Sequence, residues 1–166
     1  ASDVYKRQVC AWAVDSLNFA PAALILYGQS IGTGPTAALA ADAASSKPRW
    51  WKGGARAELG GVILHSPLAS GLRVLKPAWR LWPAWLDIFP VAAAVKRVDA
   101  PLLVLHGKRD TVVPFECGRA VAAAARAGVG DHLFLEAAGH DDIEANPKYL
   151  PRIKRFLESE ARSVAG

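Results

Sequence analysis

The chain has little of what marks metal-binding, disulfide-rich or membrane-spanning proteins. Its 166 residues include two cysteines and no methionine. Two cysteines without the paired spacing of zinc ligands support neither a metal site nor a disulfide framework, and they fit a reducing compartment. No apolar run approaches the roughly 20 residues that a membrane-spanning helix requires. Repeats and low-complexity tracts are also absent, and the length fits one globular domain.

The charge of the chain is modest and basic. Twenty lysines and arginines against 15 aspartates and glutamates give a formal net charge of +5. No basic–aromatic nucleic-acid motif accompanies this excess, so we expect no nucleic-acid partner. Several basic residues flank a central aromatic segment and are compatible with either contact with an anionic membrane or a solvated face: Arg73, Lys76, Arg80, Lys96 and Arg97.

Apolar runs alternate with helical patterns along the chain. The runs typical of buried strands are residues 22–27, 61–65, 101–106 and 132–136. Alanine-rich segments at 33–44 and 115–127 predict helices, and another is expected at 9–17. This alternation predicts an α/β fold, with a parallel sheet and helices on both faces. A last helix is expected from about Pro151, with an apolar stripe packed on the sheet: Leu150, Ile153, Phe156 and Leu157.

A Gly-x-Ser-x-Gly motif joins the first predicted strand to a helix. Strand, motif and helix together are typical of the nucleophile elbow of a serine hydrolase, in which Ser30 is held in a strained turn above the sheet edge. We expect Gly28 and Gly32 to provide the space that the close strand and helix need. The backbone N–H of Ile31, at the start of the helix, is the expected oxyanion donor.

Two further polar residues follow strands in the chain order that such an elbow requires. Asp110 comes just after the run 101–106, and His140 just after 132–136. His140 is expected to take the proton of Ser30, and Asp110 to orient the imidazole, so His140 should lie within hydrogen-bond reach of both. Alone, Asp110 is equally typical of a turn, and His140 of a surface loop. If Asp110 points away, Asp141 or Glu144 is the alternative acid. The three residues as a set favour a catalytic triad, which needs neither metal nor cofactor.

Residues 66–98, between two strands, lie where this class of fold carries a lid. Four aromatic side chains recur there at intervals of three or four, either to cover the sheet edge or to form an acyl-chain pocket: Trp79, Trp82, Trp85 and Phe89. Two other histidines follow strands. His65 is expected to make a structural hydrogen bond, and His106 to pack in the core.

Three segments resemble the α/β-hydrolase-domain-containing 17 group: residues 25–36, 62–74 and 139–144. The resemblance implies an α/β-hydrolase fold and a protein that removes palmitoyl groups from cysteines of membrane-attached proteins. It places Ser30, Asp110 and His140 as nucleophile, acid and base. It also implies a cytosol-facing enzyme with peripheral membrane contact through an N-terminal segment, and an acylated protein as substrate. The alternatives are a carboxylesterase, lipase or serine peptidase of the same fold, or a non-catalytic interaction module.

The beginning of the chain leads to two further expectations. Residues 1–8 resemble a translated cloning adapter and are interpreted as an assembly remnant, which leaves 9–166 as a partial α/β-hydrolase domain. The strands that usually precede the elbow are missing, so we expect the C-terminal portion of a longer enzyme. One of those strands carries the loop that supplies the second oxyanion N–H.

Overall fold

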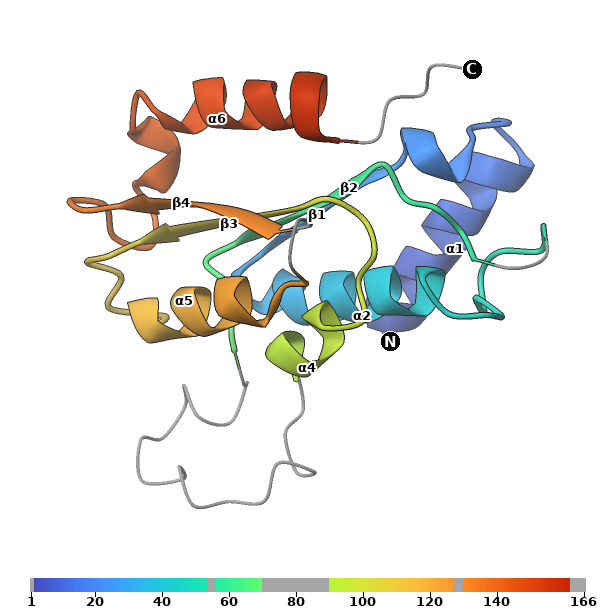
Figure 1. Cartoon of the computed structure of the whole chain (residues 1–166), viewed down its shortest axis with the longest axis horizontal. Helices are drawn as coiled ribbons and strands as arrows, with labels where there is room; N and C mark the ends of the chain where they lie inside the picture. Colours follow the sequence, from blue (N-terminus) through green and yellow to red (C-terminus); the bar gives the residue numbers. More distant parts are fainter. Residues whose placement is uncertain (1, 54–55, 70–89, 127–129, 162–166) are drawn as a thin grey trace.

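A four-stranded parallel sheet forms the centre of the computed structural model, which describes residues 2–53, 56–69, 90–126 and 130–161. The strands follow one another across the sheet in chain order (Figure 1). They are β1 (Ile25–Gln29), β2 (Gly61–His65), β3 (Leu102–Gly107) and β4 (Gly130–Leu135). The predicted parallel sheet is confirmed, and each strand lies within a few residues of its predicted position.

Helices cover both faces of the sheet, as the alternating pattern predicts (Figure 1). On one face lie α2 (Thr33–Ala43), α4 (Val91–Val95) and α5 (Phe115–Ala124), with α1 (Ser2–Asp15) packed beside α2. On the other face lies α6 (Tyr149–Arg155), which continues as the π-helical turn Phe156–Glu160. Short 3₁₀ turns occupy Pro21–Ala23, Ser30–Gly32 and Ile143–Ala145. Within the described ranges no helix combines the length and the apolar character needed to cross a membrane.

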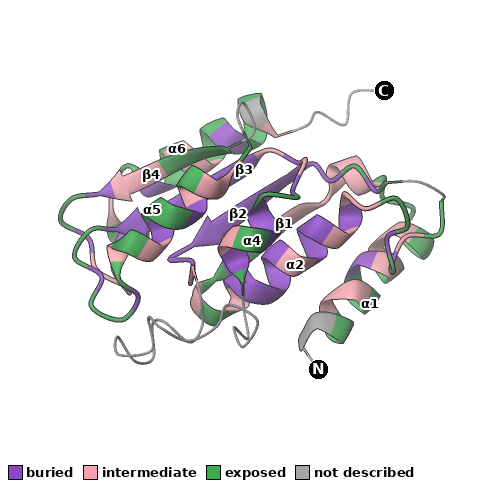
Figure 2. Ribbon diagram, turned by 60° about the horizontal axis from the view of Figure 1, so that its bottom comes forward, coloured by how far each residue is buried: buried purple, intermediate pink, exposed green. Residues whose placement is uncertain are grey.

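The two central strands are buried on both faces (Figure 2). Side chains alternate along a strand, so Val62 and Leu64 join the core under α2 while Ile63 joins the core under α6. His65 follows the same alternation and points to the α6 side, where its ring contacts Tyr149. A parallel sheet covered on both faces explains why these strands read as continuous apolar runs in the sequence.

Two helices differ from the sequence prediction at their N-terminal ends. The first helix starts at Ser2, and so includes residues 4–8, which the sequence analysis set aside. The last helix starts at Tyr149, two residues before Pro151 and close to the predicted start. Proline is tolerated there because the N–H groups of the first turn have no partner inside the helix.

The predicted apolar stripe of the last helix is only partly right. Phe156 is buried and Ile153 packs against the core, but the side chains of Leu150 and Leu157 are 69% and 47% exposed. The helix meets the sheet along Tyr149, Ile153 and Phe156, so a residue one position further along points about 100° away. The aromatic residues of the predicted lid, Trp79, Trp82, Trp85 and Phe89, lie outside the described residues.

Candidate active site

Ser30 occupies a sharp turn between β1 and α2. Its φ angle is 49°, in the left-handed region that non-glycine residues seldom adopt. A Cβ on Gly28 would lie 2.5 Å from Oγ1 of Thr36 and 2.7 Å from the Gly32 carbonyl oxygen, so this position requires glycine. At Gly32, in contrast, a Cβ would meet nothing within 4 Å, and the expectation that its missing side chain makes room is wrong. The sharp turn therefore depends on Gly28 alone of the two.

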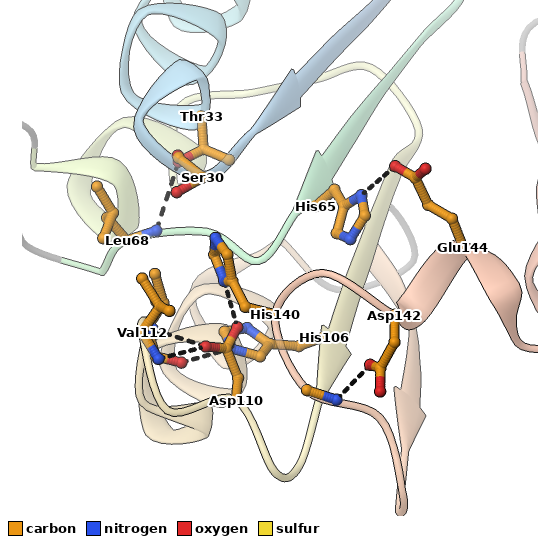
Figure 3. A network of polar contacts seen from close by, with 12 residues as sticks. Ser30, Thr33, His65, Leu68, His106, Asp110, Val112, His140, Asp142 and Glu144 are labelled. Atoms are coloured by element: carbon orange, nitrogen blue, oxygen red, sulfur yellow. Dashed lines mark hydrogen bonds and ion pairs between the residues drawn. The ribbon is translucent and has the colours of Figure 1, made fainter.

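Threonine hydroxyls fix the elbow to its surroundings. Thr33 donates its hydroxyl hydrogen bond to the Ser30 carbonyl at 2.6 Å and accepts the Leu68 N–H at 3.4 Å (Figure 3). The loop that leaves β2 is thereby attached to the first turn of α2. Behind the elbow, Lys6 donates to the Gly32 carbonyl at 3.1 Å and to Oγ1 of Thr36 at 2.7 Å. A residue of the segment 1–8 thus contacts the elbow.

Asp110 and His140 form a hydrogen-bonded pair at the carboxyl edge of the sheet. Nδ1 of His140 lies 2.7 Å from Oδ2 of Asp110, while Oδ1 of Asp110 accepts the N–H groups of Val112 at 2.9 Å and Val113 at 2.7 Å. Burial raises the pKa of Asp110, but the hydrogen bonds from His140, Val113 and Val112 outweigh it and hold that pKa below its usual value. The carboxylate is therefore ionised and can only accept, so Nδ1 of His140 is the donor of this bond and Nε2 is the ring nitrogen that the bond does not occupy.

The ring of His140 stands between Asp110 and Ser30 in Figure 3. Among the described residues, no hydrogen bond joins it to Ser30, so of the two predicted contacts only the one with Asp110 is present. The alternative acids do not take the place of Asp110. Glu144 lies 3.9 Å from Nδ1 of His65 instead, and Asp141 is exposed to solvent. The local sequence does not show how far the His140 ring lies from Ser30, because that distance depends on how two loops pack.

His65 and His106 are buried beside the site. Nδ1 of His65 lies 2.7 Å from the hydroxyl of Tyr27, which in turn lies 3.1 Å from that of Tyr149. Burial, together with the nearby His140 and His106, lowers the pKa of His65 to about 4, so its ring is neutral. His65 thus has the structural hydrogen bond that the sequence analysis expects.

His106 packs in the core as expected, but it also contacts the predicted acid. Its Nε2 lies 3.4 Å from Oδ2 of Asp110, four residues further along the chain. This second contact was not predicted from the sequence. The His-x-x-x-Asp spacing was the available signal, since it spans a strand end and the turn that follows.

Apolar side chains stand exposed around Ser30. Ile31 follows the serine directly and is 67% exposed, and Val112, beside Asp110, is 56% exposed. Leu68 lies on the same side of the site in Figure 3. An apolar rim of this kind favours a substrate with a hydrocarbon part.

The sequence of the chain matches curated proteins over most of its length. No protein-family model matches it. The α/β-hydrolase domain-containing protein 17C of Mus musculus is 42% identical over 140 residues, which are 84% of this chain and 39% of the mouse protein. The human protein 17B is 38% identical over 140 residues, 84% of this chain and 43% of its own length. The chain thus spans less than half the length of these relatives.

Solved structures share its fold at low sequence identity. The esterase domain of a Rhodothermus marinus protein superposes with a TM-score of 0.61 at 18% identity, over 92% of this chain and 64% of that one. Acyl-protein thioesterase 2 of Zea mays gives 0.51 at 23% identity, over 91% and 62%. The sheet, the strained serine turn and these matches define an α/β-hydrolase fold. The chain has that fold, and over 84% of its length it is similar to the α/β-hydrolase domain-containing 17 proteins.

Proposed function

We propose that this chain carries the catalytic residues of a serine hydrolase that cleaves fatty-acyl thioesters on protein cysteines. The observation that supports it most directly is the hydrogen bond from Nδ1 of His140 to the buried carboxylate of Asp110. That bond occupies Nδ1 of His140 and leaves Nε2 as the ring nitrogen available to take a proton, on a ring that stands between Asp110 and the strained Ser30. The proposed nucleophile, acid and base follow β1, β3 and β4, respectively. They therefore lie at one edge of the parallel sheet, where α/β folds assemble their sites.

The proposed reaction runs in two acyl-transfer steps. Ser30 Oγ attacks the thioester carbonyl carbon while Nε2 of His140 takes the hydroxyl proton. The C–S bond then breaks, and the proton passes from His140 to the leaving cysteine sulfur. A water molecule, deprotonated by the same nitrogen, attacks the acyl-serine, and Ser30 regains the proton as the fatty acid leaves. The Ile31 N–H, in the 3₁₀ turn that precedes α2, is the proposed oxyanion donor and would contribute about 3–4 kcal/mol to the barrier reduction.

The substrate class rests on the surroundings of Ser30 and on the resemblance. Exposed Ile31, which follows Ser30 in the chain, and exposed Val112, beside Asp110, offer hydrocarbon contacts at the proposed site. The segments 25–36, 62–74 and 139–144 resemble a group that acts on palmitoylated cysteines, which supports an acylated protein as substrate. Such a substrate is held at a membrane surface, and we propose that the enzyme works there from the cytosolic side.

A substrate panel separates this function from the alternatives. The full-length protein is offered a palmitoyl thioester, a matched carboxylate ester, a monoacylglycerol and a peptide amide. We expect the thioester to have the highest kcat/KM. Preference for the ester or the amide would identify a carboxylesterase, lipase or peptidase instead.

Labelling of Ser30 tests the nucleophile itself. A fluorophosphonate probe should label the wild-type protein and Ser46→Ala, a control at a serine outside the site, but not Ser30→Ala. His140→Ala should lower turnover almost as much as Ser30→Ala, and the double variant should be little worse, because the two residues act as a unit. Labelling that survives Ser30→Ala would falsify the assignment. A wild-type protein that neither hydrolyses nor labels would indicate the non-catalytic interaction module.

A further inference from the structure

His106 is buried at the end of β3, and its hydrogen bonding fixes which nitrogen carries the proton. Its Nε2 lies 3.0 Å from the carbonyl oxygen of Val113. A carbonyl oxygen can only accept, so Nε2 is the protonated nitrogen. Nδ1 is then unprotonated, and in the described part of the chain this buried atom has no hydrogen-bond partner. Burial also lowers the pKa of His106, in agreement with a neutral ring.

The N–H of His106 stabilises the turn 110–113, which carries Asp110. The Val113 carbonyl accepts it, and the Val113 N–H donates to Oδ1 of Asp110 at 2.7 Å. The same Nε2 lies 3.4 Å from Oδ2 of Asp110, the oxygen that accepts the bond from His140. Both the His106 and Asp110 side chains are fully buried, so water does not screen this contact. His106 therefore lies directly beside the Asp110 carboxylate (Figure 3).

Neighbouring side chains hold the ring of His106 in place. Phe115 contacts it edge-on, with 5.9 Å between ring centroids. A Cβ on Gly118 would lie 2.2 Å from Nδ1, so α5 packs directly against the ring at a glycine. These contacts hold the plane of the ring in place, and within that plane the bond to the Val113 carbonyl selects the orientation that directs Nε2 at it.

We propose that His106 is a positioning residue that keeps the Asp110 carboxylate directed at His140. It acts in two ways: its N–H anchors the turn 110–113 through Val113, and the same polar N–H faces Oδ2. His106 touches no substrate in this scheme. The inference rests on the proposed function, since it assigns Asp110 and His140 as acid and base.

Two substitutions separate positioning from packing. His106→Phe keeps a ring that fits against Phe115 and Gly118 but removes the N–H. His106→Gln loses the ring but can place an amide N–H near the position of Nε2. Positioning predicts that kcat for a p-nitrophenyl octanoate substrate falls about tenfold to hundredfold in His106→Phe, with KM changed less than about twofold, and largely recovers in His106→Gln. If His106 only packs in the core, kcat should instead be retained in His106→Phe and fall in His106→Gln. Val121→Ala, a buried change on α5 that leaves His106 and Asp110 intact, should lower stability without lowering kcat.

A spectroscopic measurement tests the inference independently of turnover. Nitrogen-edited NMR of labelled histidines in the full-length protein should show the Nδ1 proton of His140, shifted downfield by its bond to Asp110. We expect that signal to disappear in His106→Phe and to persist in His106→Gln. If Ser30 proves not to be the nucleophile, these spectra still decide the role of His106. An unchanged signal together with an unchanged kcat in folded His106→Phe overturns the proposal, whatever the outcome for Ser30.

Discussion

The hydroxyl of Tyr27 lies 2.7 Å from Nδ1 of His65, and this bond links the edge strand β1 to a histidine that is fully buried in β2. Tyr149 extends the contact to α6. The imidazole is therefore held in a polar cluster beneath the site, with the Glu144 carboxylate 3.9 Å away and His140 also nearby. Its pKa of about 4 is well below that of an unfolded histidine, which makes stability depend on pH.

Stability should fall as the pH decreases from about 6.5 towards 4. In that window the unfolded chain binds a proton at His65 and the folded chain does not, so acid favours unfolding by on the order of 3 kcal/mol from this residue. His106, whose pKa is also lowered, acts in the same direction. Urea unfolding at a series of pH values measures the effect. His65→Asn should flatten the dependence in part, and an identical slope in that variant would show that His65 is not its source.

Asp110→Asn should abolish most activity while the chain remains folded. The asparagine carbonyl oxygen can still accept the N–H groups of Val112 and Val113, so the turn should persist. The neutral amide no longer holds the imidazole in the tautomer that can accept the serine proton, and kcat should fall on the order of 10⁴-fold. Steady-state kinetics and circular dichroism of the same sample provide the test. A kcat within about tenfold of the wild type would rule out Asp110 as the acid.

The two elbow glycines should respond differently to substitution by alanine. Gly28→Ala places a Cβ 2.5 Å from Oγ1 of Thr36, which should cost about 1–3 kcal/mol of stability and slow labelling of Ser30. Gly32→Ala enters open space at ordinary helical dihedral angles, and should be neutral or slightly stabilising. Urea unfolding and probe-labelling rates compare the pair directly. Equal stabilities for the two variants would contradict this account of the turn.

Val112→Ser should reduce the preference for long acyl chains. The side chain is 56% exposed beside Asp110, while its backbone N–H, which bonds Asp110, is retained in the variant. Loss of one apolar contact of this size should lower kcat/KM for a palmitoyl thioester about tenfold and leave an acetyl thioester nearly unchanged. Val9→Ser, at an exposed valine on α1, is the matched control. A uniform fall for both acyl lengths would place the effect on the catalytic groups instead.

Much of the architecture could be predicted because it depends on local signals. Continuous apolar runs mark strands buried on both faces, and polar residues that follow them lie at one edge of a parallel sheet. Those two facts are enough to assign Asp110 and His140 to the same edge. The need for glycine at position 28 could also be predicted, because the elbow motif requires close packing of strand and helix there.

The remainder depends on contacts between distant segments. Nothing in the local sequence shows that Leu150 and Leu157 point to solvent, since this depends on the angle at which α6 meets the sheet. Nor does it show that the His140 ring bonds Asp110 without bonding Ser30. The contact of Lys6 with the elbow is of the same kind, because it joins the first helix to residues 26 and 30 positions away.

The order of the strands determines which connection of this fold can vary without changing the proposed catalytic residues. β2 lies between β1, which leads to Ser30, and β3, which leads to Asp110. The connection that leaves β2 therefore begins between nucleophile and acid, and Leu68 already touches the elbow through Thr33. None of the three proposed catalytic residues belongs to that connection. Insertions and replacements there can change which substrates are accepted while the elements that hold the nucleophile, acid and base remain as they are, so selection can act on specificity and on chemistry separately.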